Sequence, residues 1–325
     1  MRRAWLPLVL ALVAPLAARG ETIYAVAGGI GDIYLLRFDS ATPWVTEVAI
    51  PLGLDFGLTL EFDPQTQALY GFVRQGCPID PCPPVTNGPV IIDPHTGDWS
   101  FVDWPGFEAV PSEGSDSDIH PLTREIRSLA VSNYRYSLND LMLHVDEPLD
   151  IPLQTYGIAH TPPVEGDGGV ETYAIGYAFD WEDQLFRVGG PGGIPPASSG
   201  EVALIGQIEL GGIPTAFDIS AGGVAYFSTY DSIEVSPGEW EEVHFLYTID
   251  LGSGATTLIG KIATPDPQGY VSGIAVAPPG LGAGVLEIPA LSRLGLAAFA
   301  LLVAGLAFSR VRARRHLCER RVDAG

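Results

Sequence analysis

Basic residues are scarce in the body of this sequence. Between Glu21 and Glu287 there are seven Lys and Arg residues against 37 Asp and Glu residues, a net charge of −30. Such a surface repels the phosphates of nucleic acids and anionic membrane surfaces, so nucleic acid is excluded as a partner. It could attract cations, but we favour the simpler interpretation that the charge keeps an exported protein soluble.

Recognised catalytic and metal-binding motifs are also missing. The six His residues show neither HExxH nor HxH spacing, and there is no GxSxG elbow and no P-loop. The Gly-rich stretch 189–193 is interpreted as a turn. The sequence therefore assigns no catalytic residue and no cofactor, and it favours a protein that is not an enzyme.

The middle of the chain lacks long helix-favouring runs and contains hairpins instead. The clearest is 245–260, in which apolar residues alternate along a strand that ends at Asp250. The same arrangement, Asp-x-x-Thr or Asp-x-x-Ser between strand-like runs, occurs at Asp39, Asp63, Asp93 and Asp250. Asp in the first position of a turn accepts backbone N–H groups two residues on, so these four acids are predicted to form turns.

The fold class predicted from this repetition is all-β. Further hairpins are expected at 127–145, 171–189 and 215–230, without intervening helices. Repeated hairpins of this kind predict a β-propeller, which at about 40–45 residues a blade would have about six blades over residues 21–278. We expect 22–26 to pair with 273–277 and close the ring. An open β-sandwich or two stacked sheets is the alternative.

The two ends of the chain differ from the body. Residues 1–20 have the charged, apolar and small-residue regions of a signal peptide, with an uncleaved anchor as the alternative. Residues 279–287 are a Pro/Gly linker, and 294–308 are uncharged and apolar, as in a transmembrane helix. The positive-inside rule places the residues after this helix, including 316–325, in the cytoplasm and the body outside the inner membrane. The stop-transfer residues are Arg310, Arg312, Arg314 and Arg315.

Cysteine is rare, with three residues in the chain. Cys77 and Cys82 lie in a Pro-rich insertion, 75–89, and lack the second ligand pair of a zinc site. Because the body is expected to be exported, we predict a local disulfide between them.

The C-terminal region 288–315 resembles a known sorting signal. An Ile-Pro-x-Leu-Ser motif, an apolar helix and an Arg cluster follow one another, which is similar to the IPTL-type signal of the PEP-CTERM-like group of Gram-negative bacteria. Ala290 and Leu294 stand where that signal usually has Thr and Trp. The resemblance implies an exosortase-like protease as partner and transfer to the cell surface or matrix. The matching residues are Ile288, Pro289, Leu291, Ser292 and Gly295.

The body resembles a family of exported bacterial propeller-like domains of unknown function. The similar segments are 126–133, 216–226, 245–262 and 272–278. This resemblance implies no catalytic residue, because the family has no assigned chemistry.

A second insertion, 108–125, is acidic and is predicted to be a mobile loop. Its candidate ligands for Ca²⁺ are Glu113, Asp116, Asp118 and His120, although the register of a calcium loop is missing. Three functions follow as hypotheses. The favoured one is a non-enzymatic surface or matrix propeller that binds a polysaccharide or protein. The alternatives are an extracellular polysaccharide hydrolase or lyase with carboxylates at the propeller centre, and a calcium-dependent adhesin.

Overall fold

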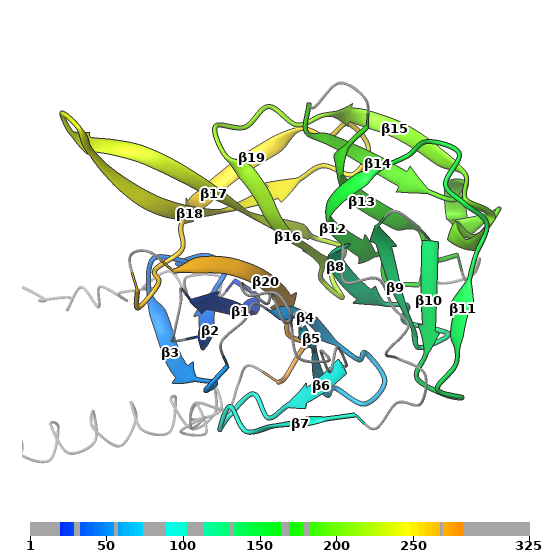
Figure 1. The fold of residues 1–325 in the computed structure, drawn as a ribbon, viewed down its shortest axis with the longest axis horizontal. Helices are drawn as coiled ribbons and strands as arrows, with labels where there is room; N and C mark the ends of the chain where they lie inside the picture. Colours follow the sequence, from blue (N-terminus) through cyan, green and yellow to red (C-terminus); the bar gives the residue numbers. More distant parts are fainter. Residues whose placement is uncertain are drawn as a thin grey trace, which may run out of the picture. The chain divides into compact units, whose positions relative to one another are not determined.

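The protein is described here from a computed structural model, in which the body of the chain is built from strands (Figure 1). No helix in this part is long and apolar enough to cross a bilayer. The predicted signal peptide and transmembrane segment lie outside it. The described residues are 20–28, 33–54, 58–73, 89–102, 114–130, 133–163, 169–178, 182–266 and 269–281.

The strands form five antiparallel sheets of four strands each, the blades of a β-propeller. Blade 1 consists of β20 (Tyr270–Val276), β1 (Thr22–Gly28), β2 (Ile33–Asp39) and β3 (Thr46–Pro51). Blade 2 consists of β4 (Leu58–Phe62), β5 (Leu69–Val73), β6 (Pro89–Ile92) and β7 (Trp99–Phe101). Blade 3 consists of β8 (Gly114–Ile119), β9 (Glu125–Ala130), β10 (Asn133–Ser137) and β11 (Leu143–Val145). Blade 4 consists of β12 (Gln154–His160), β13 (Thr172–Tyr177), β14 (Gln184–Val188) and β15 (Val202–Gln207). Blade 5 consists of β16 (Ile213–Ile219), β17 (Ala225–Ser236), β18 (Glu239–Ile249) and β19 (Thr256–Lys261).

Two short 3₁₀ helices, η2 (Pro191–Gly193) and η3 (Ala197–Ser199), lie between β14 and β15. The first of them, η2, lies in the Gly-rich stretch 189–193 that the sequence predicted to be a turn.

The predicted number of six blades is wrong, because the described strands form five. The inner strands β4, β8, β12, β16 and β20 begin at residues 58, 114, 154, 213 and 270, so most blades are longer than the repeat length assumed. Longer connections and, in blade 5, the longer strands β17 and β18 account for the extra residues.

Pairing of the two ends of the body closes the ring, as predicted. β1 is antiparallel to β20, with Ile23 opposite Val276 and Ala25 opposite Ile274. Blade 1 therefore takes its inner strand from the end of the body and its other three strands from the start. This arrangement joins the two ends of the body within one blade by backbone hydrogen bonds and removes an open edge.

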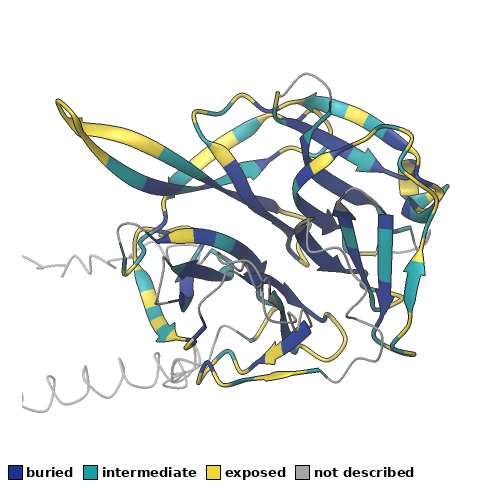
Figure 2. Ribbon diagram, viewed as in Figure 1, coloured by how far each residue is buried: buried dark blue, intermediate teal, exposed yellow. Residues whose placement is uncertain are grey.

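The inner strands are buried because each blade packs against both of its neighbours (Figure 2). All five residues of β4 are buried, whereas the outer strand β3 alternates between half-buried and exposed residues. Apolar side chains fill the spaces between blades; Phe38 of blade 1 and Leu246 of blade 5 share one cluster, for example. The core thus surrounds the inner strands and fixes their polar side chains in place.

The four predicted Asp turns are present. In each, the Asp carboxylate accepts the backbone N–H two residues on, and the pairs are Asp39–Ala41, Asp63–Gln65, Asp93–His95 and Asp250–Gly252. At Asp250 the hydroxyl of Ser253 donates to the same carboxylate at 2.6 Å. These acids shape turns, as the sequence indicated.

The expected mobile loop at 108–125 is wrong over its described part. Gly114–Ile119 is β8, the inner strand of blade 3, and it hydrogen-bonds to β9. His120 then opens the turn, since its Nδ1 accepts the N–H groups of Leu122 and Thr123 at 3.3 and 3.2 Å. Its His-Pro dipeptide occupies the place of Asp-Pro in blade 2, a signal that sequence reasoning missed.

The strand directions assign the connections to two ends of the propeller. The four Asp turns lie at the end where the inner strands finish, the turn end. Strands β5 and β7 finish at the opposite end, the loop end. The β17–β18 hairpin also projects from the loop end (Figure 1). Its residues 231–243 are called the arm below.

Candidate functional site

Three carboxylates from different blades meet among the inner strands. Glu61 lies on β4, Asp118 on β8 and Asp218 on β16, and one oxygen of each lies within 4.8 Å of the other two. Their side chains are buried, with residue exposures of 7%, 3% and 4%. We call these three residues the central carboxylate cluster.

The cluster follows from one repeated position. In each of the three blades, the backbone N–H of one residue closes the first hairpin. These closing residues are Asp63, His120 and Ser220, and each member of the cluster lies two residues before one of them. In blades 4 and 1 the same position holds Ala159 and Ala275. Three acids and two small residues therefore occupy equivalent places around the axis, close to the turn end.

Two members of the cluster connect neighbouring blades. Asp118 Oδ2 accepts the backbone N–H of His160 on β12 and lies 2.9 Å from Nδ1 of the same residue. Asp218 Oδ2 accepts the backbone N–H of Val276 on β20 at 2.5 Å. Carboxylates of the preceding blade thus accept backbone N–H groups at the edges of two inner strands. These hydrogen bonds hold neighbouring blades of the ring together.

A fourth buried acid, Asp116, makes a longer connection. Its Oδ2 accepts the N–H of Phe217 on β16 at 3.1 Å, and its Oδ1 accepts the N–H of Ser117 at 3.1 Å. Asp116 therefore joins blade 3 to blade 5, which are not neighbours in the ring.

Burial changes the protonation of these acids. Burial, together with the charges of Asp118 and Asp218, raises the pKa of Glu61 well above its usual value. Burial and the charge of Asp118 raise the pKa of Asp218 to about 7. Burial also raises the pKa of Asp116 well above its usual value. Protonated carboxyls at this spacing can donate to one another, which makes their close approach tolerable.

The central carboxylate cluster is also the set of described residues that could hold a metal ion. Ca²⁺ binds oxygens at about 2.3–2.6 Å, so three oxygens within 4.8 Å of one another can surround one ion. The bonds from His160 and Val276 already occupy oxygens of Asp118 and Asp218. An ion at this place would therefore compete with the connections between blades.

The residues predicted from the sequence have different outcomes. Asp116 and Asp118 are brought near Asp218, but on a buried strand, not on the exposed loop that was expected. Sequence reasoning missed Glu61 and Asp218, whose available signal was an acid two residues before a turn. The remaining predicted residues lie outside the described part: Glu113, Cys77, Cys82, Ile288, Pro289, Leu291, Ser292, Gly295, Arg310, Arg312, Arg314 and Arg315.

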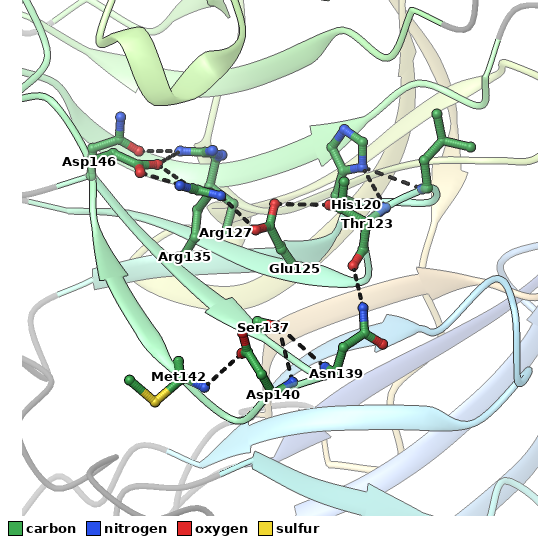
Figure 3. A network of polar contacts seen from close by, with 12 residues as sticks. His120, Thr123, Glu125, Arg127, Arg135, Ser137, Asn139, Asp140, Met142 and Asp146 are labelled. Atoms are coloured by element: carbon green, nitrogen blue, oxygen red, sulfur yellow. Dashed lines mark hydrogen bonds and ion pairs between the residues drawn. The ribbon is translucent and has the colours of Figure 1, made fainter.

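A second polar network, within blade 3, consists of ion pairs between Arg side chains and acids (Figure 3). Arg127 donates to Asp146 at 2.9 Å, and Arg135 donates to Asp146 at 2.7 Å and to Glu125 at 2.6 Å. Arg124 binds Asp63 at 2.6 Å across the boundary of blades 2 and 3. Because these few cations are paired internally, they neutralise little of the surface charge.

Comparisons with known proteins assign neither a family nor an activity to the chain. No protein-family model matches the chain, and no curated protein matches it. Among solved structures, a protein of unknown function from Bacteroides caccae resembles it, with a TM-score of 0.36 and 10% sequence identity over 79% of this chain and 98% of that chain. This likeness assigns no ligand or reaction to the chain.

Proposed function

We propose that this chain is an exported β-propeller, displayed at the cell surface or held in the matrix, that binds a partner and catalyses no reaction. Residues 1–20 would direct its export. The region 288–315 would anchor it in the membrane or be removed by an exosortase-like protease that transfers the body outward. The support for both steps is the sequence pattern of the two ends.

The burial of the central carboxylate cluster carries the non-enzymatic part of the proposal. Glycoside hydrolases hold their two carboxyls about 5–5.5 Å or about 6.5–9.5 Å apart, with the sugar between them. Here the oxygens lie within 4.8 Å, the residues are at most 7% exposed, and backbone N–H groups already occupy two of the carboxylates. This geometry suits a structural role better than the hydrolase or lyase alternative.

The arm supports binding at the loop end. It extends there beyond the sheet of blade 5, and many of its residues are exposed. Ligand-binding residues in proteins concentrate on projecting segments that a rigid scaffold positions.

Two measurements test the proposal. The purified protein, incubated with a panel of polysaccharides, should release no new reducing ends and no unsaturated sugars; release of either supports the enzyme alternative. Cell fractionation followed by mass spectrometry of the native C-terminus should find the protein outside the cytoplasm, ending near Ile288 if it is sorted. A protein found in the cytoplasm would contradict export.

A calcium-dependent adhesin is the second candidate, and the 4.8 Å spacing of the cluster is the observation in its favour. It predicts that Ca²⁺ stabilises the folded state, since a ligand that binds only the native form raises the melting temperature. The Discussion gives the corresponding measurement.

A further inference from the structure

The arm continues two strands beyond the sheet of blade 5. In the described pairing, β16 accompanies β17 only as far as Tyr230, and β19 accompanies β18 only from Phe245 onward. Residues 231–243 therefore form a two-stranded ribbon outside the blade, with many exposed residues (Figure 2). A ribbon of this kind adds little to the stability of a sheet, so its residues are free to serve another purpose.

The register of the ribbon divides its side chains between two faces. Directly opposed residues of an antiparallel pair share a face, and the face changes at each step. Tyr230 is opposite His244, Ser232 is opposite Glu242, and Glu234 is opposite Trp240, so these six side chains share one face. A hydrogen bond to Glu242 is the largest cause of the raised pKa of Tyr230, which agrees with this assignment. Tyr270 extends the same face, because its ring centroid lies 5.8 Å from that of Tyr230. We call the face the aromatic strip.

The aromatic strip alternates flat rings with polar groups. Tyr230 and Tyr270 form one end, and Trp240, which is 62% exposed, lies near the other. Glu234, the partner of Trp240, lies four steps along the strand from Tyr230, so the two aromatic positions are about 13 Å apart along the ribbon at roughly 3.3 Å per residue. Ser232 and Glu242 lie between them. The strip is therefore elongated, and it suits a chain molecule with apolar faces and hydroxyl edges.

The other face of the ribbon has a different composition. Ile233 is opposite Glu241, whose carboxylate accepts a hydrogen bond from Lys261 at 2.6 Å. Val243 is buried on that side. Ile233 is therefore a matched control position, on the same ribbon but outside the strip.

The negative charge of the arm limits the classes of ligand that it can bind. The arm contains five acidic residues and no Lys or Arg: Asp231, Glu234, Glu239, Glu241 and Glu242. Polymers of uronic acids, sulfated sugars and nucleic acids are repelled by such a surface. The rings of a neutral sugar can stack their C–H faces on Tyr and Trp, and their hydroxyls can donate to Glu carboxylates.

We propose that the aromatic strip binds a neutral polysaccharide chain, which lies along the arm and contacts Trp240 and the Tyr230–Tyr270 pair. The inference rests on the proposed binding function and adds the place and the ligand class.

The test is affinity electrophoresis of the full chain with neutral xyloglucan, dextran and mixed-linkage β-glucan, anionic alginate, cationic chitosan and poly-L-lysine as probes. At least one neutral glucan or xyloglucan should retard the protein, and alginate should not. Trp240→Ala should weaken that retardation at least tenfold, while Ile233→Ala should leave it within twofold. A shortened arm, in which Asn-Gly replaces 232–242 between the paired residues Asp231 and Val243, should bind as weakly as Trp240→Ala and melt at the same temperature as the natural chain.

The outcomes separate the strip from the wider proposal. Retardation that survives both Trp240→Ala and the shortened arm would place binding elsewhere on the propeller and overturn the strip alone. Release of reducing ends from a bound glycan would overturn the non-enzymatic proposal and leave the strip intact. Binding to none of the neutral polysaccharides would overturn the inference. Binding to poly-L-lysine alone would overturn it in favour of a basic protein partner.

Discussion

Asp218 on β16 accepts the backbone N–H of Val276 on β20 at 2.5 Å, and thereby joins the last complete blade to the strand that closes the ring. Asp118 makes the same kind of bond to His160 one blade earlier. Asp118 and Asp218 thus each accept a backbone N–H of the next blade's inner strand that would otherwise lack this partner.

Removing the Asp218 carboxyl should destabilise the fold. Asp218→Ala leaves the Val276 N–H without its partner in a buried place, at a cost of about 1–3 kcal/mol in the free energy of unfolding. Urea denaturation measures this loss. Asp218→Asn, which keeps an acceptor oxygen, should lose less, and equal losses in the two variants would contradict the role assigned to the bond.

The stability of the protein should fall as the pH rises from about 4 to about 7. The pKa of Asp218 is raised to about 7 in the folded state, so the native form binds more protons than the unfolded form in this window. The contribution is complete below the unfolded pKa and is lost as the pH passes the folded one. At 1.36 kcal/mol for each pKa unit, the rise from 3.8 to about 7 corresponds to about 4 kcal/mol.

Denaturation at a series of pH values tests this slope. Asp218→Asn should reduce the slope, because its side chain does not titrate, whereas Asp250→Asn in an exposed turn should preserve it. A natural protein whose stability rises between pH 4 and 7 would show that the cluster is stabilised by its charged form.

Two turns of the same design should contribute differently to the free energy of unfolding. Asp250 bonds only within its turn in the contacts described above, whereas Asp63 is fully buried and also accepts two hydrogen bonds from Arg124, at 2.6 and 3.0 Å. Asp63→Ala should therefore cost about 3–5 kcal/mol, since it leaves a guanidinium without its partner. Asp250→Ala should cost about 1 kcal/mol. Comparable losses in urea denaturation would argue against a role for the Arg124 contact.

Calcium should not change the melting temperature at pH 6. The raised pKa values of Glu61 and Asp218 favour protonated carboxyls at that pH, and a protonated oxygen is a poor ligand for a cation. Scanning calorimetry in millimolar CaCl₂ and in EDTA should give the same value. A clear rise with CaCl₂, abolished by Asp218→Asn, would favour the calcium-dependent adhesin.

Local features of the fold could be predicted because they depend on neighbours in the chain. Asp39, Asp63, Asp93 and Asp250 each bond to groups two or three residues away, so their turns are visible in a short window of sequence. The number of blades could not be counted in this way. Each blade is counted from its inner strand, and the sequence does not show which strands are the inner ones. Connections of irregular length also conceal the repeat.

The sequence by itself determined that the body is an acidic, repetitive all-β structure, because alternation and turn chemistry act over a few residues. Pairing of its first and last strands could be expected because a closed ring leaves no open edge. Only the tertiary structure decided the central carboxylate cluster. Glu61, Asp118 and Asp218 are far apart in the chain, and each resembles an ordinary surface acid until packing of the blades buries it. Bringing them within 4.8 Å requires three inner strands to meet around one axis, and no local pattern records that meeting.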